Sequence, residues 1–134
     1  MRSIDVRELA RMQQESCIDL IDVRTPVEFR QLHAVGATNI PIDVLGLENI
    51  RGARSGRSDD PLYVICASGQ RSRRSIQKLT KLGIDNVVNV DGGTSAWEQA
   101  GLPVIRGQRT LALPQQMQIA AGTMVTTGFV LGMG

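Results

Sequence analysis

Apolar residues follow two different periodicities along the chain, and these predict strands and helices in alternation. Three aliphatic runs, at residues 17–23, 62–65 and 87–90, are nearly continuous. Such runs indicate parallel strands, because helices cover both faces of a parallel sheet and each strand is buried on both sides. A shorter run at 38–40 ends at Pro41, which favours a minor strand at the edge of the sheet.

Between these runs, apolar residues recur every three to four positions, which is the spacing of a helix with one buried face. The predicted helices span residues 5–14, 26–35, 44–50, 72–82 and 95–100. Residues 51–60 are rich in charged and helix-breaking residues without periodicity, and they predict a surface loop. Strands that alternate with helices predict an α/β fold with a mostly parallel sheet, whose ligand sites lie beyond the carboxyl ends of the strands.

Composition limits both the number of domains and the kinds of partner. At 134 residues the chain is long enough for one hydrophobic core, and 42% hydrophobic against 21% charged residues is typical of a globular protein. A net charge of +2 excludes the broad positive field of a nucleic-acid binder. Two cysteines are too few for a disulfide scaffold, and the N-terminus has no apolar secretory run. We therefore expect a cytoplasmic protein whose partners are small or locally recognised.

The segment that follows the strand at 62–65 carries the candidate chemistry. It begins at Cys66 and has the sequence Cys-Ala-Ser-Gly-Gln-Arg-Ser. So short a connection must curl. Gly69 allows backbone N–H groups to point toward one centre, and the start of the next helix adds unpaired donors and partial positive charge. These groups, with the guanidinium of Arg71, are expected to lower the pKa of Cys66 from about 8.5 and to make its thiolate a nucleophile.

Two residues of this loop also have simpler interpretations. Cys66 is an ordinary core cysteine if it does no more than end a buried strand. Arg71 lies at the start of the predicted helix. Its simpler interpretation is an exposed side chain or the partner of a carboxylate, with no part in the chemistry. The glycine, the arginine and the helix start occur together, and this combination favours the functional interpretation of Cys66.

Three motifs in the same order resemble those of the rhodanese family, and the resemblance covers residues 3 to 106. They are residues 20–29 with 33–41, the Cys66 loop, and residues 90–104. One small departure is Ala34-Val35, which stands where the family commonly has Ile-Pro. The resemblance implies a three-layer α/β fold in which a five-stranded, mainly parallel sheet is flanked by helices, within a domain of residues 1–107.

The resemblance also implies a sulfurtransferase. The Cys66 thiolate is expected to attack the outer sulfur of thiosulfate or of a persulfide, and the Cys66 persulfide to pass that sulfur to cyanide, a thiol or a protein acceptor. The rest of the loop is expected to bind the small anionic donor: Ala67, Ser68, Gly69, Gln70, Arg71 and Ser72. The exchange is expected to need no metal and no organic cofactor, and no nucleic-acid partner is expected.

Residues near the motifs are expected to have structural roles. These are an ion pair of Asp22 with Arg24, a turn held by His33, and helix surface at Arg73 and Arg74. Cys17 begins a predicted buried strand, so packing is its expected role. The alternative for Cys17 is a redox pair with Cys66.

Two other functions compete with sulfur transfer. A loop that joins a cysteine to an arginine also suits a phosphatase or an arsenate reductase. However, four residues separate Cys66 from Arg71, where the phosphatase signature has five, and the longer loop is what lets phosphorus reach the sulfur. A non-enzymatic persulfide carrier or binding module is the second alternative, and the presence of both the cysteine and the arginine favours an enzyme.

The last part of the chain, residues 108–134, is expected to be a separate tail. Its apolar stretch from 119 to 134 is about 16 residues long, which is short of the roughly 20 that cross a bilayer. The run at 118–122, Gln-Ile-Ala-Ala-Gly, resembles the start of the membrane segment in bacterial inner-membrane rhodanese proteins. We therefore expect a truncated transmembrane or membrane-associated helix within 113–134, with the domain facing the cytoplasm. The alternatives are an added amphipathic helix, a loose tail and a dimer contact.

Overall fold

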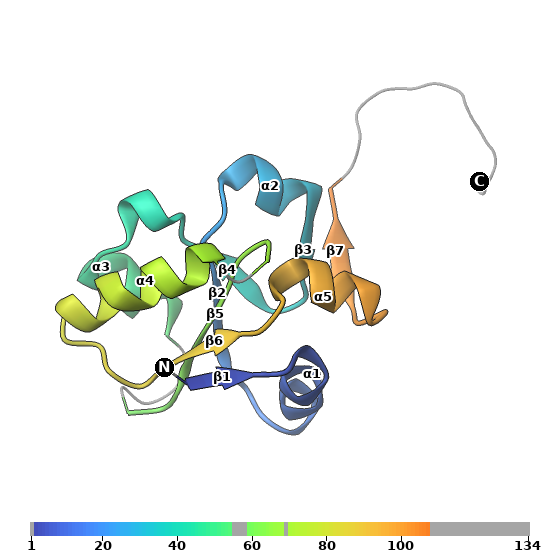
Figure 1. Ribbon diagram of the computed structural model, residues 1–134, viewed down its shortest axis with the longest axis horizontal. Helices are drawn as coiled ribbons and strands as arrows, with labels where there is room; N and C mark the ends of the chain where they lie inside the picture. Colours follow the sequence, from blue (N-terminus) through green and yellow to red (C-terminus); the bar gives the residue numbers. More distant parts are fainter. Residues whose placement is uncertain (1, 55–58, 69, 108–134) are drawn as a thin grey trace.

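The computed structural model describes residues 2–54, 59–68 and 70–107, and its centre is a parallel sheet between two layers of helices (Figure 1). The elements in chain order are β1 (Arg2–Ile4), α1 (Val6–Glu15), β2 (Asp19–Asp22), α2 (Pro26–Gln31), β3 (Leu32–Ala34), β4 (Ala37–Asn39), η1 (Ile42–Val44), α3 (Leu47–Ala53), β5 (Leu62–Ile65), α4 (Gln70–Lys81), β6 (Val87–Val90), α5 (Gly93–Gln99) and β7 (Val104–Arg106). Strands and helices alternate along most of the chain, as the apolar pattern predicts.

The main sheet has five strands in the order β1, β6, β5, β2, β4. Every pairing in it is parallel. β4 lies at one edge, as its short apolar run predicts, and β5 lies at the centre. The predicted fold class, a five-stranded and mainly parallel sheet flanked by helices, is confirmed.

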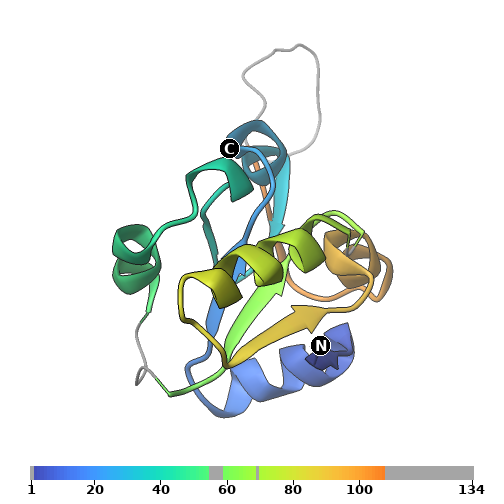
Figure 2. The same ribbon diagram turned by 60° about the vertical axis from the view of Figure 1, so that its left-hand side comes forward.

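The sheet separates two hydrophobic cores, because successive residues of a strand point to opposite faces. The central strand shows this most clearly: Leu62 and Val64 pack with Ile76 and Leu79 of α4, whereas Tyr63 and Ile65 pack with Leu9 of α1 and Trp97 of α5. Figures 1 and 2 show α3 and α4 on one side of the sheet and α1 and α5 on the other. Helices on both faces explain why the strand at 62–65 is apolar throughout.

The helix predicted over residues 26–35 ends earlier, because its last residues belong to a second sheet. α2 stops at Gln31, and the next three residues form β3, which pairs antiparallel with β7. The backbone N–H of Val35 donates to the carbonyl of Pro103 over 3.1 Å, and that of Gly107 donates to Gln31 over 3.2 Å. The pairing partner is distant in the sequence, so local periodicity could not reveal it, and the prediction of a helix to residue 35 is wrong.

Other boundaries differ by a few residues. α3 begins at Leu47 and continues to Ala53, so residues 51–53 are helical and do not belong to the predicted loop. Residues 55–58 of that loop lie outside the described part of the chain. β1 was not predicted, because three residues are too few to show a periodicity, and it forms by pairing with β6. α4 and α5 each begin two residues before the predicted start.

The predicted tail, residues 108–134, also lies outside the described residues. The domain boundary at 107 and the membrane-associated helix within 113–134 therefore stay predictions. Among the residues that the structure describes, no helix is both long and apolar enough to cross a membrane.

Candidate active site

Cys66 lies directly beyond the carboxyl end of β5, the central strand of the sheet. Its side chain is buried, with 1% of the residue exposed. Ala67 and Ser68 lead toward α4, which begins at Gln70. Parallel sheets hold ligand sites at this edge, so the fold places the predicted nucleophile where such a site is expected.

The predicted donor-binding residues differ in their exposure. Ser68 and Gln70 are exposed, Ala67 and Arg71 are half-buried, and Ser72 is fully buried in the first turn of α4. Gly69 lies outside the described residues. Their role in binding a donor stays a prediction.

The start of α5 holds the backbone of the Cys66 loop. The N–H of Thr94 donates to the carbonyl of Cys66 over 2.7 Å, and that of Ser95 donates to Ala67 over 3.1 Å. Gly93 makes this approach possible: its φ is +60°, and a Cβ there would stand 2.2 Å from the Cys66 carbonyl oxygen. Gly93 was predicted only as part of a motif near a helix start. Two adjacent glycines, Gly92 and Gly93, one residue beyond a buried strand were the available signal for close backbone contact.

Arg71 is paired with Glu28 of α2. Its two terminal nitrogens donate to the two carboxylate oxygens over 2.7 and 2.9 Å. This bidentate geometry is the strong form of a charged hydrogen bond. Pairing with a carboxylate was the simpler interpretation of Arg71, and the structure bears out that contact.

Glu28 has a second structural task at the start of α2. Its carboxylate accepts a hydrogen bond from the backbone N–H of Thr25, whose hydroxyl in turn accepts one from the N–H of Glu28. This capping box orients the carboxylate toward Arg71. Glu28 had no predicted role of its own. The spacing Thr-Pro-x-Glu was the signal that could have identified the cap, although it could not have shown the ion pair.

The pair also changes the acidity of both groups. The hydrogen bonds from Arg71, followed by those from Thr25, outweigh partial burial and lower the pKa of Glu28 from 4.5 to about 2. The pKa of Arg71 is raised, chiefly by its hydrogen bonds to Glu28, with smaller contributions from the charges of Cys66 and Asp22. Arg71, Glu28, Asp22 and Cys66 thus form one electrostatic cluster.

The lowered pKa of Glu28 predicts how this pair contributes to stability at acidic pH. The folded-state pKa lies below the unfolded value of 4.5, so the contribution is complete above about pH 4.5 and is lost as the pH falls toward 2. Both side chains are about a third exposed, so solvent screening limits the contribution to about 1 kcal/mol. Urea unfolding of the wild type and of Glu28→Gln should show a difference at pH 7 that shrinks between pH 4.5 and 2. A difference independent of pH would contradict this.

A second ion pair lies at the carboxyl end of β2, beside β5. Asp22 is fully buried and Arg24 is 6% exposed. The carboxylate accepts hydrogen bonds from Nε and Nη2 of Arg24 over 2.9 to 3.1 Å, and from its backbone N–H over 3.0 Å. Arg24 also donates to the carbonyl of Leu32. The predicted structural pair of Asp22 with Arg24 is confirmed.

The buried hydroxyl of Ser72 is hydrogen-bonded to the side-chain oxygen of Asn89 on β6. The side-chain nitrogen of Asn89 donates in turn to Asp91 over 3.2 Å. This chain of polar groups ties the first turn of α4 to the strand that precedes α5. The two helix starts around Cys66 are therefore fixed relative to each other.

The remaining candidates are Arg73, Arg74 and His33. Arg73 and Arg74 are exposed, as predicted for helix surface. His33 was expected to hold a turn; it lies in β3, where its Nδ1 is 2.7 Å from the carbonyl of Phe29, and the two rings stack. The described residues contain no group of three or more His, Cys, Asp or Glu side chains that could hold a metal ion.

Cys17 is exposed and unbridged, so the packing role expected for it is wrong. The reason is that β2 begins only at Asp19, which pairs with Leu62 at the amino end of β5. Cys66 follows the opposite end of β5. The offset between the two cysteines is roughly 20 Å at the rise of a strand, and a disulfide needs Cα atoms within about 7 Å. The alternative of a Cys17–Cys66 redox pair within one chain is therefore excluded.

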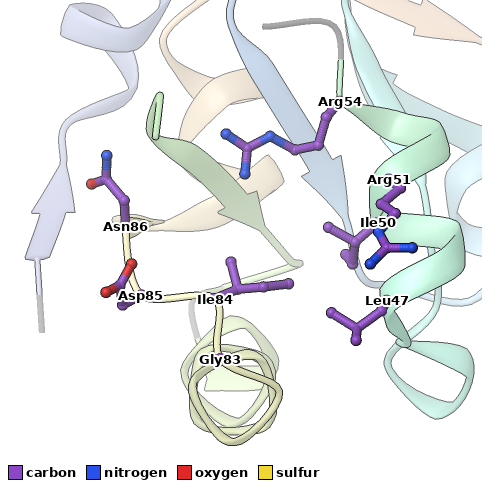
Figure 3. Close-up of a pocket in the computed structure, with 8 residues that line it drawn as sticks. All are labelled: Leu47, Ile50, Arg51, Arg54, Gly83, Ile84, Asp85 and Asn86. Atoms are coloured by element: carbon purple, nitrogen blue, oxygen red, sulfur yellow. The ribbon is translucent and has the colours of Figure 1, made fainter. Parts of the chain in front are cut away.

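A surface cavity of about 500 Å³ lies at the amino end of the sheet, away from Cys66. It is formed between α3 and the connection from α4 to β6, and Figure 3 shows Ile84 pointing across it toward Ile50 and Leu47. Arg54, on its wall, is 2.8 Å from the carboxylate of Asp19. This cavity is separate from the Cys66 loop.

Comparison with known proteins gives a consistent result. The model of the rhodanese-like domain family matches residues 5–100. An uncharacterised protein of Synechocystis is 31% identical over 97% of this chain and 71% of its own length. The thiosulfate sulfurtransferase GlpE of Vibrio cholerae is 31% identical over 75% of this chain and 92% of its own. A rhodanese-related protein from Thermoplasma volcanium, known from a crystal structure, is 32% identical in sequence, and the two structures match with a TM-score of 0.62. The match covers 78% of this chain and 98% of the Thermoplasma chain.

Proposed function

Because this chain belongs to the family of rhodanese-like domains, we propose that it is a sulfurtransferase that carries sulfane sulfur on Cys66. The likeness to a thiosulfate sulfurtransferase supports this activity. The observation that carries the proposal is the position of Cys66: a buried thiol at the carboxyl end of the central strand, between the starts of α4 and α5.

The proposed reaction has two steps. The thiolate of Cys66 attacks the outer sulfur of thiosulfate or of a persulfide, and the old sulfur–sulfur bond breaks with its electron pair leaving on sulfite or on a thiolate. A thiophilic acceptor then attacks the outer sulfur of the Cys66 persulfide, and the Cys66 thiolate is regenerated. The leaving groups take up the electron pairs themselves, so the exchange calls for no metal and no organic cofactor.

The loop after Cys66 is proposed to bind the donor. Backbone N–H groups at the start of α4 would stabilise the negative charge of a thiolate or persulfide, because a helix N-terminus presents unpaired donors and partial positive charge. The proposed binding residues remain Ala67, Ser68, Gly69, Gln70, Arg71 and Ser72. Sulfite, a thiol or a protein acceptor would leave or enter over the exposed part of this loop, at Ser68 and Gln70.

The test is the intact mass of the full chain after incubation with thiosulfate or with a small persulfide. We expect the wild type to gain about 32 Da, the mass of one sulfur atom bound as a persulfide, and to lose it when cyanide is added. Cys66→Ser should gain nothing. Cys17→Ser is the matched control, because Cys17 is the exposed second thiol, and it should behave as the wild type does.

Two results would reject the proposal. If neither donor adds mass to the wild type, sulfur transfer fails and a non-enzymatic binding module takes its place. If the protein hydrolyses an aryl phosphate and Cys66→Ser does not, the phosphatase alternative is correct, despite the four-residue spacing between Cys66 and Arg71.

A further inference from the structure

Two arginine side chains near the carboxyl ends of β2 and β5 are each paired with one carboxylate. Arg71 is held by both carboxylate oxygens of Glu28. Arg24 is held in the same manner by Asp22. Each of these two guanidinium charges is therefore compensated by a carboxylate, including that of Arg71 in the proposed site.

This balance matters because sulfane donors differ in charge. Thiosulfate has two negative charges, whereas an organic thiosulfonate has one and carries the same kind of sulfur–sulfur bond. Moving a doubly charged anion out of water costs more than moving a singly charged one. An uncompensated arginine would offset that cost, but Arg71 is already compensated by Glu28.

Resting on the proposed sulfur transfer, we propose that Glu28 is a specificity-determining residue that makes singly charged sulfane donors, such as organic persulfides and thiosulfonates, better substrates than thiosulfate. The capping box fixes the carboxylate at the start of α2, where it faces Arg71 on α4. Figures 1 and 2 show α2 beside the start of α4, at the edge of the sheet where β5 ends. A dianion that approaches Arg71 therefore meets the Glu28 carboxylate as well.

The same chemical step operates for both donors. The Cys66 thiolate forms a bond to the outer sulfur, and the old sulfur–sulfur bond breaks with its electron pair leaving on sulfite from thiosulfate, or on a sulfinate from a thiosulfonate. Both reactions give the same Cys66 persulfide. A change in the donor ratio on substitution thus reports on the first step, in which the donor binds and loads Cys66, and not on the second step, in which the acceptor removes the sulfur.

The test compares kcat/KM for thiosulfate and for benzenethiosulfonate, with cyanide as the common acceptor. The substitution is Glu28→Gln, which removes the charge but leaves an oxygen that can cap Thr25. If the donor lies about 6 Å from the Glu28 carboxylate, one unit charge changes the preference about 3- to 10-fold. The variant should therefore raise kcat/KM for thiosulfate relative to benzenethiosulfonate by that factor, and 0.5 M salt should reduce the gain.

Glu15→Gln is the matched control. Glu15 is an exposed glutamate at the end of α1, on the other face of the sheet, and it is paired with Arg11 over 2.9 Å. This variant changes the net charge by the same amount, so its donor ratio should equal that of the wild type. An equal shift in Glu15→Gln would mean that net charge alone sets the preference, and would overturn the role of Glu28.

An unchanged donor ratio in Glu28→Gln would also overturn the role of Glu28. An equal fall of kcat/KM with both donors is such a case, because it reflects only the structural task of the cap. If neither donor loads Cys66 in the wild type, the proposed sulfur transfer has failed, and the specificity role fails with it. The mass measurement on the wild type separates that case from the others.

Discussion

Alanine at position 93 is expected to destabilise the fold and to slow persulfide formation on Cys66. The new Cβ would stand 2.2 Å from the carbonyl oxygen of Cys66, and 2.8 Å from the carbonyl carbon and oxygen of Ala67. These three are backbone atoms, so none of them can rotate away, and the loop or α5 must move. We expect a loss of on the order of 3 kcal/mol or more in the free energy of unfolding, measured by urea denaturation.

The same displacement should reduce the rate of sulfur loading. The contact between Gly93 and the Cys66 carbonyl is part of the geometry that positions the thiol, and a shift of about 1 Å at a reacting group costs about 100-fold in rate. The rate of mass gain with a sulfane donor, at a temperature where the variant stays folded, measures this. An unchanged rate would mean that the loop does not depend on α5 for its position.

Gly101→Ala is the control for the backbone conformation of Gly93. Gly101 has a φ of +73°, close to the +60° of Gly93, but a Cβ there meets nothing within 4 Å. It therefore bears only the cost of a left-handed conformation, roughly 1–2 kcal/mol, and it should load sulfur as the wild type does. Equal losses in the two variants would show that the collision at Gly93 is relieved at no cost.

The parts of this molecule that could be predicted from the sequence are those fixed by local patterns. β5 and β6 have the predicted bounds, because a strand buried on both faces must be apolar at every position. The position of Cys66 followed from the same pattern, since it directly succeeds β5. The family resemblance then gave the number of strands and the order of the motifs.

The parts that could not be predicted depend on contacts between distant residues. The partner of Arg71 is Glu28, 43 positions earlier, and any of several carboxylates would have fitted the sequence equally well. β3 looked helical because its apolar spacing continues that of α2, and only its pairing with β7 decides the conformation. Cys17 looked buried because the apolar run begins there, although the strand itself begins two residues later.

The buried ion pair of Asp22 with Arg24 is expected to have the other large effect. Asp22→Asn keeps the size of the side chain but leaves the guanidinium of Arg24 buried without a compensating charge. Removing one partner of a buried pair typically costs about 3–5 kcal/mol, and we expect a loss of this size in the free energy of unfolding at pH 7. Urea denaturation measures it.

A double variant tests whether the cost arises from the isolated charge. Asp22→Leu with Arg24→Met replaces both partners by apolar side chains, and buried pairs replaced in this way are often no less stable. With both charges removed, no buried charge is left without a partner. The carbonyl of Leu32 does lose the donor that Arg24 provides. The double variant should therefore be more stable than Asp22→Asn. If it is no more stable than Asp22→Asn, the pair stabilises the carboxyl end of β2 through its hydrogen bonds to the backbone, and charge compensation contributes little.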